Sequence, residues 1–268
     1  MRADYLDIGG CRSFVLQEGE GVPVLLLHTA GQHGVQWRHV QGELASHGYR
    51  VVVPDLPGHG KSEPASGGPV RDLRTYAAWC AEVIDTLDLD RPFIVGCSIG
   101  GRISLDLAAR MGDRLRGVIA MAAHGHRDSH PRLTEHGLER ELVDSAAPSR
   151  ADRTYFGTKA VVGASVSTET AELIALMHRR EDPAVSTSDL IGWTRHDLGT
   201  DLDTIACPVH LVAGTDDLWV DPADVARTAD RIPRSELTVL DGIGHYPMEE
   251  VSDFADTLHG WMKGLTDL

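Results

Sequence analysis

The 268-residue sequence is poor in cysteine. It contains four, Cys11, Cys80, Cys97 and Cys207, and no two of them form a C-x-x-C pair. A disulfide-rich scaffold and a cysteine zinc site both need closely spaced cysteines, so the sequence indicates neither. We expect the four thiols to be reduced.

Long apolar runs are also missing. No stretch approaches the roughly 18 apolar residues that indicate a membrane-spanning helix. The first ten residues, MRADYLDIGG, lack the apolar stretch of a secretory signal peptide. These absences argue against a membrane protein, and we expect the protein in the cytoplasm.

Positive charge is scarce as well. The sequence has 25 Lys and Arg against 40 Asp and Glu, which gives a formal net charge of −15. Nucleic acids and anionic membranes are recognised by concentrated Lys and Arg, so this balance argues against both as partners. A small-molecule substrate is the expected partner, and the sequence leaves a homo-oligomer open.

Apolar residues are present in sufficient number, 42%, for a substantial core. Short apolar runs (VPVLLLH, YRVVVPD, PFIVG and LRGVIAMAA) alternate with helical patterns such as DLRTYAAWCAEVIDTLDL. Continuous apolar runs are typical of strands buried on both faces, and their alternation with helices indicates right-handed crossovers. The sequence therefore predicts an α/β fold with a mostly parallel, doubly wound sheet, preceded by a hairpin that turns at Gly9-Gly10.

The alternation stops between about residues 126 and 202. Polar helical stretches replace the strand-like runs there: EHGLERELVDSA, TETAELIALMHRRE and TSDLIGWTRHD. Strand and helix patterns resume with CPVHLVAGTDD, and a final helix is expected from about Met248. We divide the chain into a core of residues 1–125 and 203–268 and an inserted helical cap of residues 126–202. Its natural place is over the carboxyl ends of the strands, where open α/β sheets bind ligands.

Ser98 lies in GCSIGG, where the run PFIVG gives way to a helical pattern. A turn serine is one interpretation. The alternative is a nucleophile held out by a tight bend, and it requires a base and an acid that orients this base. Asp216 and Asp217 follow one later strand, and His245 follows the next. A G-x-S-x-G strand–turn–helix with the chain order Ser, acid, His favours catalysis.

With these features the chain resembles the α/β-hydrolase family along nearly its whole length. LLLHTAG is similar to the family's loop after the third strand, and PDLPGHGKS to its D-x-x-G-x-G-x-S stretch. GTDD is similar to its acid turn, and GIGHYPMEE to its histidine loop. The resemblance implies a triad of Ser98, Asp217 and His245, because the family's G-x-x-D spacing from Gly214 favours Asp217 over Asp216.

The resemblance also implies an oxyanion hole. By position in the family, the backbone N–H groups of Ala30 and Ile99 are expected to hold the oxyanion. The family's loop commonly begins His-Gly, whereas this sequence has His28-Thr29-Ala30-Gly31.

Substrate specificity is expected to reside in the cap and at its mouth. The candidate pocket-lining residues are His124, Tyr155, Phe156, Met177, His178, Trp193 and His196.

The stretch HGHRDSH offers a different chemistry. His124, His126, Asp128 and His130 differ by one residue from the H-x-H-x-D-H pattern of the metallo-β-lactamase family, in which such side chains bind zinc. The spacing is wrong for that pattern, and a G-x-S-x-G site needs no metal. We expect neither a metal nor another cofactor.

The sequence therefore favours a serine hydrolase that cleaves a carboxylic ester, lactone or related acyl substrate through an acyl-enzyme. Three alternatives stay open. The same triad hydrolyses carbon–carbon bonds in β-diketone-like substrates, a ligand sensor keeps the triad and turns over slowly, and a metallohydrolase would use the histidine cluster. The fold does not select the substrate.

Overall fold

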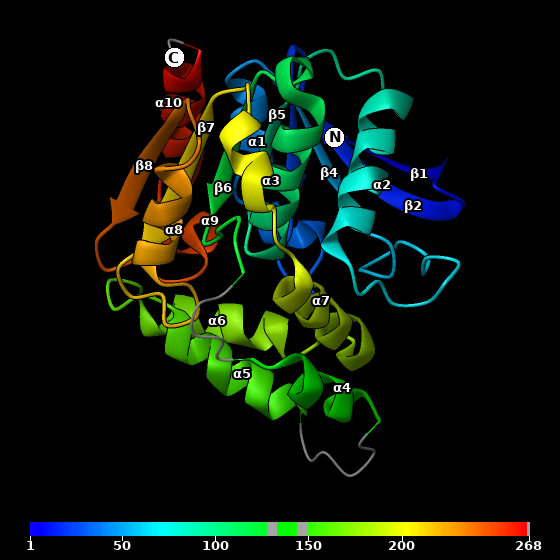
Figure 1. Cartoon of the computed structure of the whole chain (residues 1–268), viewed down its shortest axis with the longest axis vertical. Helices are drawn as coiled ribbons and strands as arrows, with labels where there is room; N and C mark the ends of the chain where they lie inside the picture. Colours follow the sequence, from blue (N-terminus) through cyan, green and yellow to red (C-terminus); the bar gives the residue numbers. More distant parts are fainter. Residues whose placement is uncertain (128–132, 144–149, 267–268) are drawn as a thin grey trace.

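The sheet is mostly parallel, as predicted. The computed structural model describes residues 1–127, 133–143 and 150–266. Within them eight strands form one sheet in the order β1-β2-β4-β3-β5-β6-β7-β8 (Figure 1). The strands are β1 (Arg2–Ile8), β2 (Cys11–Glu18), β3 (Val22–Leu27), β4 (Tyr49–Pro54), β5 (Phe93–Cys97), β6 (Gly117–Met121), β7 (Val209–Gly214) and β8 (Ser235–Leu240). β1 and β2 pair antiparallel, as do β2 and β4, and the later pairs are parallel.

The β1–β2 hairpin turns where the sequence predicts. Ile8 pairs with Cys11 across the turn, and Gly9 and Gly10 both have positive φ, +59° and +70°. Two-residue hairpins of the type I′ class need positive φ at both central positions, which glycine adopts without steric cost.

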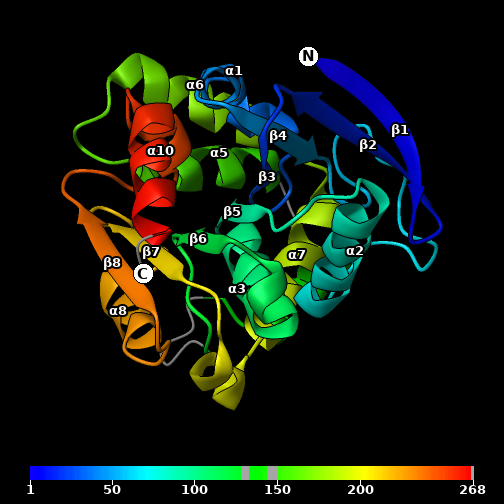
Figure 2. The ribbon, with the colours of Figure 1, turned by 90° about the horizontal axis from the view of Figure 1, so that it is seen from above.

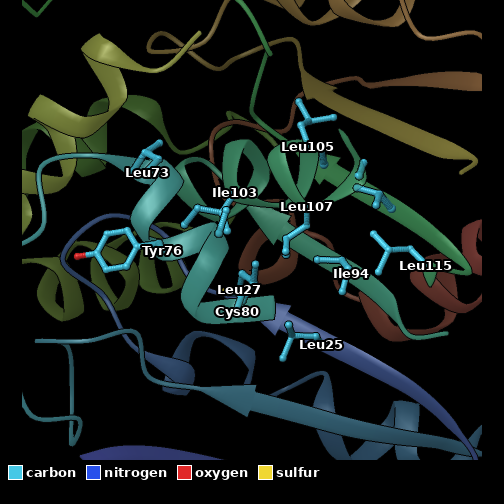
Figure 3. Packing of buried hydrophobic residues seen from close by; sticks show 14 of the residues in the cluster. Leu25, Leu27, Leu73, Tyr76, Cys80, Ile94, Ile103, Leu105, Leu107 and Leu115 are labelled. Atoms are coloured by element: carbon cyan, nitrogen blue, oxygen red, sulfur yellow. The ribbon is translucent and has the colours of Figure 1, made fainter. Parts of the chain in front are cut away.

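The central strands are buried on both faces, which explains their continuous apolar runs. Along β3, Leu25 and Leu27 pack into one apolar cluster, whereas Val24 and Leu26 pack into the other. Successive side chains of a strand point to opposite faces, so each cluster takes every second residue. Figure 3 shows Leu25, Leu27 and Ile103 among the side chains of the first cluster.

Helices cover both faces of the sheet (Figure 2). On one face lie α2 (Leu73–Thr86), α3 (Ile99–Met111) and α8 (Pro222–Ala229), whose apolar residues belong to the first cluster. On the other lie α1 (Gln41–Ser46) and α10 (Phe254–Leu265), which contribute to the second cluster. The final helix begins later than predicted: α9 (Pro247–Glu250) is a separate turn, and α10 starts at Phe254.

Between β6 and β7 the described chain is helical. We refer to α4 (Glu135–Val143), α5 (Arg150–Val161), α6 (Thr168–His178) and α7 (Pro183–Arg195) as the cap helices. They gather at one end of the sheet, the end to which the β8 arrow points (Figure 1). The sequence did not single out α5. The domain division at residues 126 and 202 stays a prediction.

In the part of the chain that the structure describes, no helix is both long and apolar enough to cross a membrane.

The parallel strands bring distant loops together. β3, β5, β6, β7 and β8 are neighbours and run in the same direction, so the segments that follow them emerge at one edge of the sheet. Ligands of open α/β sheets bind at this edge. Residues 28–31, 98, 215–217 and 241–245 all follow these strands directly.

A buried histidine in β7 makes stability depend on pH. His210 is 4% exposed, its Nε2 lies 2.8 Å from Thr238 Oγ1, and burial lowers its pKa from 6.5 to about 4. The unfolded chain binds a proton on His210 more readily than the folded chain does. The contribution of the neutral His210 to stability is therefore fully present above pH 6.5 and is lost as the pH falls toward 4. We expect the wild type to lose about 3 kcal/mol more than His210→Asn over this range.

Urea unfolding at pH 7, 5.5 and 4 measures this difference. His39→Gln changes an exposed histidine. Its free energy of unfolding should depend on pH as that of the wild type does. If the free energy of unfolding falls equally with pH in the wild type and in His210→Asn, His210 does not contribute to the acid sensitivity.

Candidate active site

Ser98 occupies a strained backbone conformation between β5 and α3. Its φ is +58° and its ψ is −120°, a combination that is costly for a residue with a Cβ atom. Its N–H donates to the carbonyl of Met121 at 2.9 Å, which ties the bend to the neighbouring β6. This sharp strand-to-helix turn presents the serine at the carboxyl end of the sheet.

Two glycines of GCSIGG permit the bend because the surrounding backbone leaves no room for a side chain at these positions. A Cβ atom on Gly96 would lie 2.2 Å from the carbonyl oxygen of Gly100, and one on Gly100 would lie 2.6 Å from that of Leu27. The start of α3 therefore packs directly on the end of β3. Ser98 and the loop at residues 28–32 are neighbours as a result.

His245 is paired with a buried carboxylate. Its Nδ1 lies 2.7 Å from Asp217 Oδ2, and both residues are buried. The other carboxylate oxygen of Asp217 accepts the backbone N–H groups of Trp219 and Val220 at 2.8 and 3.0 Å. The adjacent Asp216 instead accepts the N–H of Ala164 at 2.7 Å. Of the two aspartates in GTDD, Asp217 is thus the one in hydrogen-bond contact with the imidazole of His245.

The loop that carries His245 is anchored to the cap. The His245 N–H donates to the carbonyl of Val161, at the end of α5, at 2.9 Å. The Glu250 carboxylate bridges the same two segments by accepting three backbone N–H groups at 2.6 to 2.9 Å. These come from Gly163, Gly244 and Tyr246. Burial raises the pKa of Glu250, although these hydrogen bonds oppose the effect.

The loop at residues 28–32, which we call the oxyanion loop because the sequence predicts an oxyanion donor at Ala30, is held on both sides of Ala30. The Thr29 N–H donates to Gln36 Oε1 at 2.9 Å, and the Gly31 N–H donates to Asp189 Oδ2 at 2.9 Å. The N–H groups that flank Ala30 are therefore committed to other partners.

His28 braces the start of this loop. Its Nε2 accepts the N–H of Leu56 at 3.1 Å, so its Nδ1 carries the proton and donates to the Thr29 carbonyl at 2.9 Å. Burial holds the pKa of His28 well below its ordinary value. His28 is therefore a neutral structural residue.

Cys97, next to Ser98, is not a competing nucleophile. The thiol is buried, and burial together with the charge of Asp217 raises its pKa well above its ordinary value. It donates to the carbonyl of His245 at 3.2 Å. Only the thiolate of cysteine is strongly nucleophilic, so this group stays inert.

Several of the candidate pocket residues contact core elements. His178 is buried with its ring 4.7 Å from that of Tyr246, and its Nδ1 lies 2.6 Å from Glu181 Oε1. Trp193 is buried beneath the Arg102 guanidinium, 3.6 Å from the ring centroid. The buried His196 has its Nε2 3.1 Å from Asp106 Oδ2.

The α5 and α6 candidates are more open. The hydroxyl of Tyr155 donates to the Glu172 carboxylate at 2.6 Å. Phe156 is 66% exposed and packs edge-on against Tyr155. Met177 is half-buried, and its carbonyl lies 3.5 Å from the side-chain amide of Gln32.

The histidine cluster is only partly described. Asp128 and His130 lie outside the described residues. His124 Nε2 accepts from the Arg102 guanidinium at 3.0 Å, and its Nδ1 donates to the His126 carbonyl at 2.9 Å. His126 Nε2 lies 3.1 Å from Asp224 Oδ1. Across residues 1–127, 133–143 and 150–266, no group of three or more His, Cys, Asp or Glu side chains is arranged to hold a metal ion.

Sequence reasoning missed two residues at this site. Trp219 is 45% exposed, and its ring lies edge-on to His245 with 4.9 Å between centroids. Its place two residues after Asp217 was the available signal. Asp189 contacts the oxyanion loop from α7, 158 positions along the chain from Gly31, and no local pattern marks it.

Comparisons with known proteins agree with this fold. A family model described as alpha/beta hydrolase fold matches residues 22–188. A pimeloyl-[acyl-carrier protein] methyl ester esterase of Aeromonas salmonicida is 27% identical over 237 residues, which cover 85% of this chain and 90% of that protein. A 2-hydroxy-6-oxo-2,4-heptadienoate hydrolase of Pseudomonas putida is 37% identical over 121 residues, which cover 44% and 43%.

Among solved structures, a thermophilic esterase from Thermogutta terrifontis superimposes with a TM-score of 0.85. The identity is 23%, and the match covers 99% of this chain and 100% of that one. This likeness establishes the shared fold.

Proposed function

The chain belongs to the alpha/beta hydrolase fold family, and from this premise we propose that it hydrolyses a carboxylic ester or lactone through an acyl-enzyme on Ser98. The observation that carries the proposal is the buried His245–Asp217 pair at the sheet edge where Ser98 is held in a strained turn. The esterase relative supports an ester substrate. A lactone is a cyclic ester and reacts by the same steps.

The proposed first half-reaction forms the acyl-enzyme. Because Nδ1 of His245 is bonded to Asp217, Nε2 is the ring nitrogen available to accept the Ser98 proton. The serine oxygen then attacks the carbonyl carbon, and the N–H groups of Ala30 and Ile99 stabilise the negative oxygen. His245 returns the proton to the leaving alcohol as the carbon–oxygen bond breaks.

The second half-reaction releases the acid. His245 takes a proton from water, the resulting hydroxide attacks the acyl carbon, and the proton passes to Ser98 as its ester bond breaks. Asp217 stabilises the imidazolium in both halves without becoming protonated. No metal or cofactor takes part in this proposal.

Carbon–carbon bond hydrolysis is the second candidate. The observation that favours it is the 37% identity with the 2-hydroxy-6-oxo-2,4-heptadienoate hydrolase, although that match covers less than half of either chain. The same triad would act on a β-diketone-like substrate.

Intact-mass spectrometry tests the proposal. The protein is incubated with a fluorophosphonate and with a panel of p-nitrophenyl esters, lactones and β-diketones. We expect a phosphonyl adduct on Ser98, transient acyl adducts from esters or lactones, and multiple turnovers that EDTA does not inhibit. An unmodified Ser98 would contradict the serine mechanism. Turnover of diketones alone would select the second candidate. A burst that is not followed by turnover would indicate the ligand sensor, and inhibition by EDTA would indicate the metallohydrolase.

Trp219 is proposed to form an apolar wall beside His245. Its indole lies beside α5: a Cβ atom placed on Gly157 would be 3.4 Å from Trp219 Cζ2. We expect Trp219→Ala to raise KM for a p-nitrophenyl octanoate by about tenfold through lost apolar contact, with a much smaller effect on the acetate.

Steady-state kinetics on both esters measure this selectivity. Leu218→Ala is the matched control, since Leu218 is similarly exposed at 51% and adjacent in sequence. Equal changes for the two esters in Trp219→Ala would show that the indole does not contact the acyl chain.

A further inference from the structure

Asp189 connects the cap to the core at a buried position. It lies on α7, and its side chain is fully buried. Three donors surround the carboxylate. Oδ2 accepts the Gly31 N–H at 2.9 Å and lies 2.8 Å from His59 Nε2, and Oδ1 accepts the Tyr76 hydroxyl at 2.9 Å. All three partners lie outside the cap helices.

These partners compensate the charge of the buried carboxylate. His59 Nδ1 lies 3.2 Å from the carbonyl of Pro57, which only accepts, while its Nε2 faces the carboxylate. Both ring nitrogens therefore face acceptors, which favours the doubly protonated imidazolium. Burial opposes this charge, but the charge and hydrogen bond of Asp189 outweigh it and raise the pKa of His59.

Tyr76 contributes from α2. Figure 3 shows its ring among the core residues with its hydroxyl directed away from Leu27 and Ile103. This hydroxyl meets Oδ1, not the oxygen that holds the loop. Tyr76 and Gly31 thus contact different oxygens of one carboxylate.

The Gly31 bond lies one residue from a proposed oxyanion donor. Gly31 has φ +66°, and a Cβ atom there would lie 2.6 Å from Ser186 of α7 and from the Glu181 carboxylate. The loop therefore fits closely against the cap at the point where Asp189 bonds it. Displacement of the Ala30–Gly31 peptide would reorient the preceding peptide, which carries the Ala30 N–H.

The other side of Ala30 also leads to the cap. Gln36, which accepts the Thr29 N–H, has its Nε2 3.4 Å from His178 Nε2 on α6. The cap helices thus contact both flanks of the oxyanion loop, directly at Gly31 and through Gln36 at Thr29.

We propose that Asp189 is a positioning residue that holds the oxyanion loop in the geometry required for transition-state stabilisation. The proposal rests on the proposed serine hydrolase function. The cap then acts on the rate of the chemical step as well as on substrate choice, because a carboxylate of α7 fixes the peptide next to the oxyanion donor.

The test compares Asp189→Ala, Asp189→Asn and Tyr76→Phe in the full-length protein. Each variant is assayed for kcat and KM on p-nitrophenyl acetate, and for its affinity for an aryl trifluoromethyl ketone. This ketone adds to the catalytic serine and places an oxyanion in the hole. Fluorophosphonate titration counts the active sites, so that a partly unfolded sample is not mistaken for a slow enzyme.

We expect Asp189→Ala to lower kcat per active site by about 30-fold with KM within about threefold, since a misplaced donor weakens the transition state more than the ground state. Ketone affinity should fall by a similar factor. Asp189→Asn should lose about fivefold, because the amide oxygen can accept from Gly31 and His59 as Oδ2 does but has no negative charge, so both hydrogen bonds weaken. Tyr76→Phe should stay within about threefold in both measurements, since Oδ2 keeps its partners.

Wild-type kcat and ketone affinity in Asp189→Asn and in any folded Asp189→Ala would overturn the positioning role. Should Asp189→Ala fail to fold, Asp189→Asn alone decides. A Tyr76→Phe loss as large as that of Asp189→Ala would also overturn it, because the effect would then follow cap stability. A wild-type protein that neither reacts with the fluorophosphonate nor binds the ketone would instead refute the serine hydrolase function.

Discussion

Ser98→Ala is expected to lower kcat/KM for p-nitrophenyl esters by about 10⁴-fold or more while the protein stays folded. The substitution removes the oxygen that forms the acyl-enzyme, and the remaining groups can only assist a direct attack by water. Alanine also has a Cβ atom, so the positive φ at this position is retained with its cost. The stability of the variant should therefore be close to that of the wild type.

Initial rates together with thermal unfolding check this expectation. Ser104→Ala is the matched control, because it removes a buried hydroxyl of the adjacent helix α3, one that donates to the Gly100 carbonyl at 2.7 Å. It should retain most of the activity. A Ser98→Ala protein with a tenth of the wild-type rate would refute Ser98 as the nucleophile.

Asp217→Asn is expected to lower kcat by about 10⁴-fold, because an amide leaves the imidazole free to adopt the wrong tautomer and does not stabilise the imidazolium. The backbone donors of Trp219 and Val220 still need the acceptor oxygen at the Oδ1 position. The side-chain NH₂ group is then directed at His245. This arrangement favours a proton on Nε2, where the base must have none.

Asp216→Asn serves as the neighbouring control. Its carboxylate accepts the Ala164 N–H rather than touching His245, and an amide oxygen can accept the same bond. We expect kcat within about threefold of wild type. Steady-state kinetics at pH 8 measure both variants, and a large loss in Asp216→Asn with a small one in Asp217→Asn would exchange their roles.

The sheet could be predicted from the sequence because its signals are local. Strands buried on both faces are apolar at most positions, and β3 to β7 show this as short runs in which Arg50 and His210 are the polar exceptions. The G-x-S-x-G turn is equally local, since Gly96 and Gly100 are needed where a Cβ atom would lie 2.2 and 2.6 Å from a neighbouring carbonyl oxygen. Chain order then supplied His245 and an aspartate for the same site.

The contacts between cap and core could not be predicted in this way. Asp189 lies in TSDLIGWTR, where a polar residue in a helix usually faces water. Its burial becomes favourable only because His59, Tyr76 and the Gly31 N–H come from three other parts of the chain. The break before α10 was missed for a similar reason. Glu250, the last residue of α9, accepts the N–H groups of Gly163, Gly244 and Tyr246, and no local pattern indicates these contacts.

The bond between the His245 N–H and the Val161 carbonyl has a consequence for protein engineering. Transplanting a cap from a relative is an attractive way to change the substrate, since we expect the cap to determine substrate specificity. In this chain the segment around Val161 and Gly163 holds the loop that carries His245, the proposed general base. A transplanted cap would replace the backbone contacts that hold the His245 loop, so we expect grafting to disturb catalysis as well as selectivity. Altering individual side chains on the existing helices is the sounder route to a new substrate range.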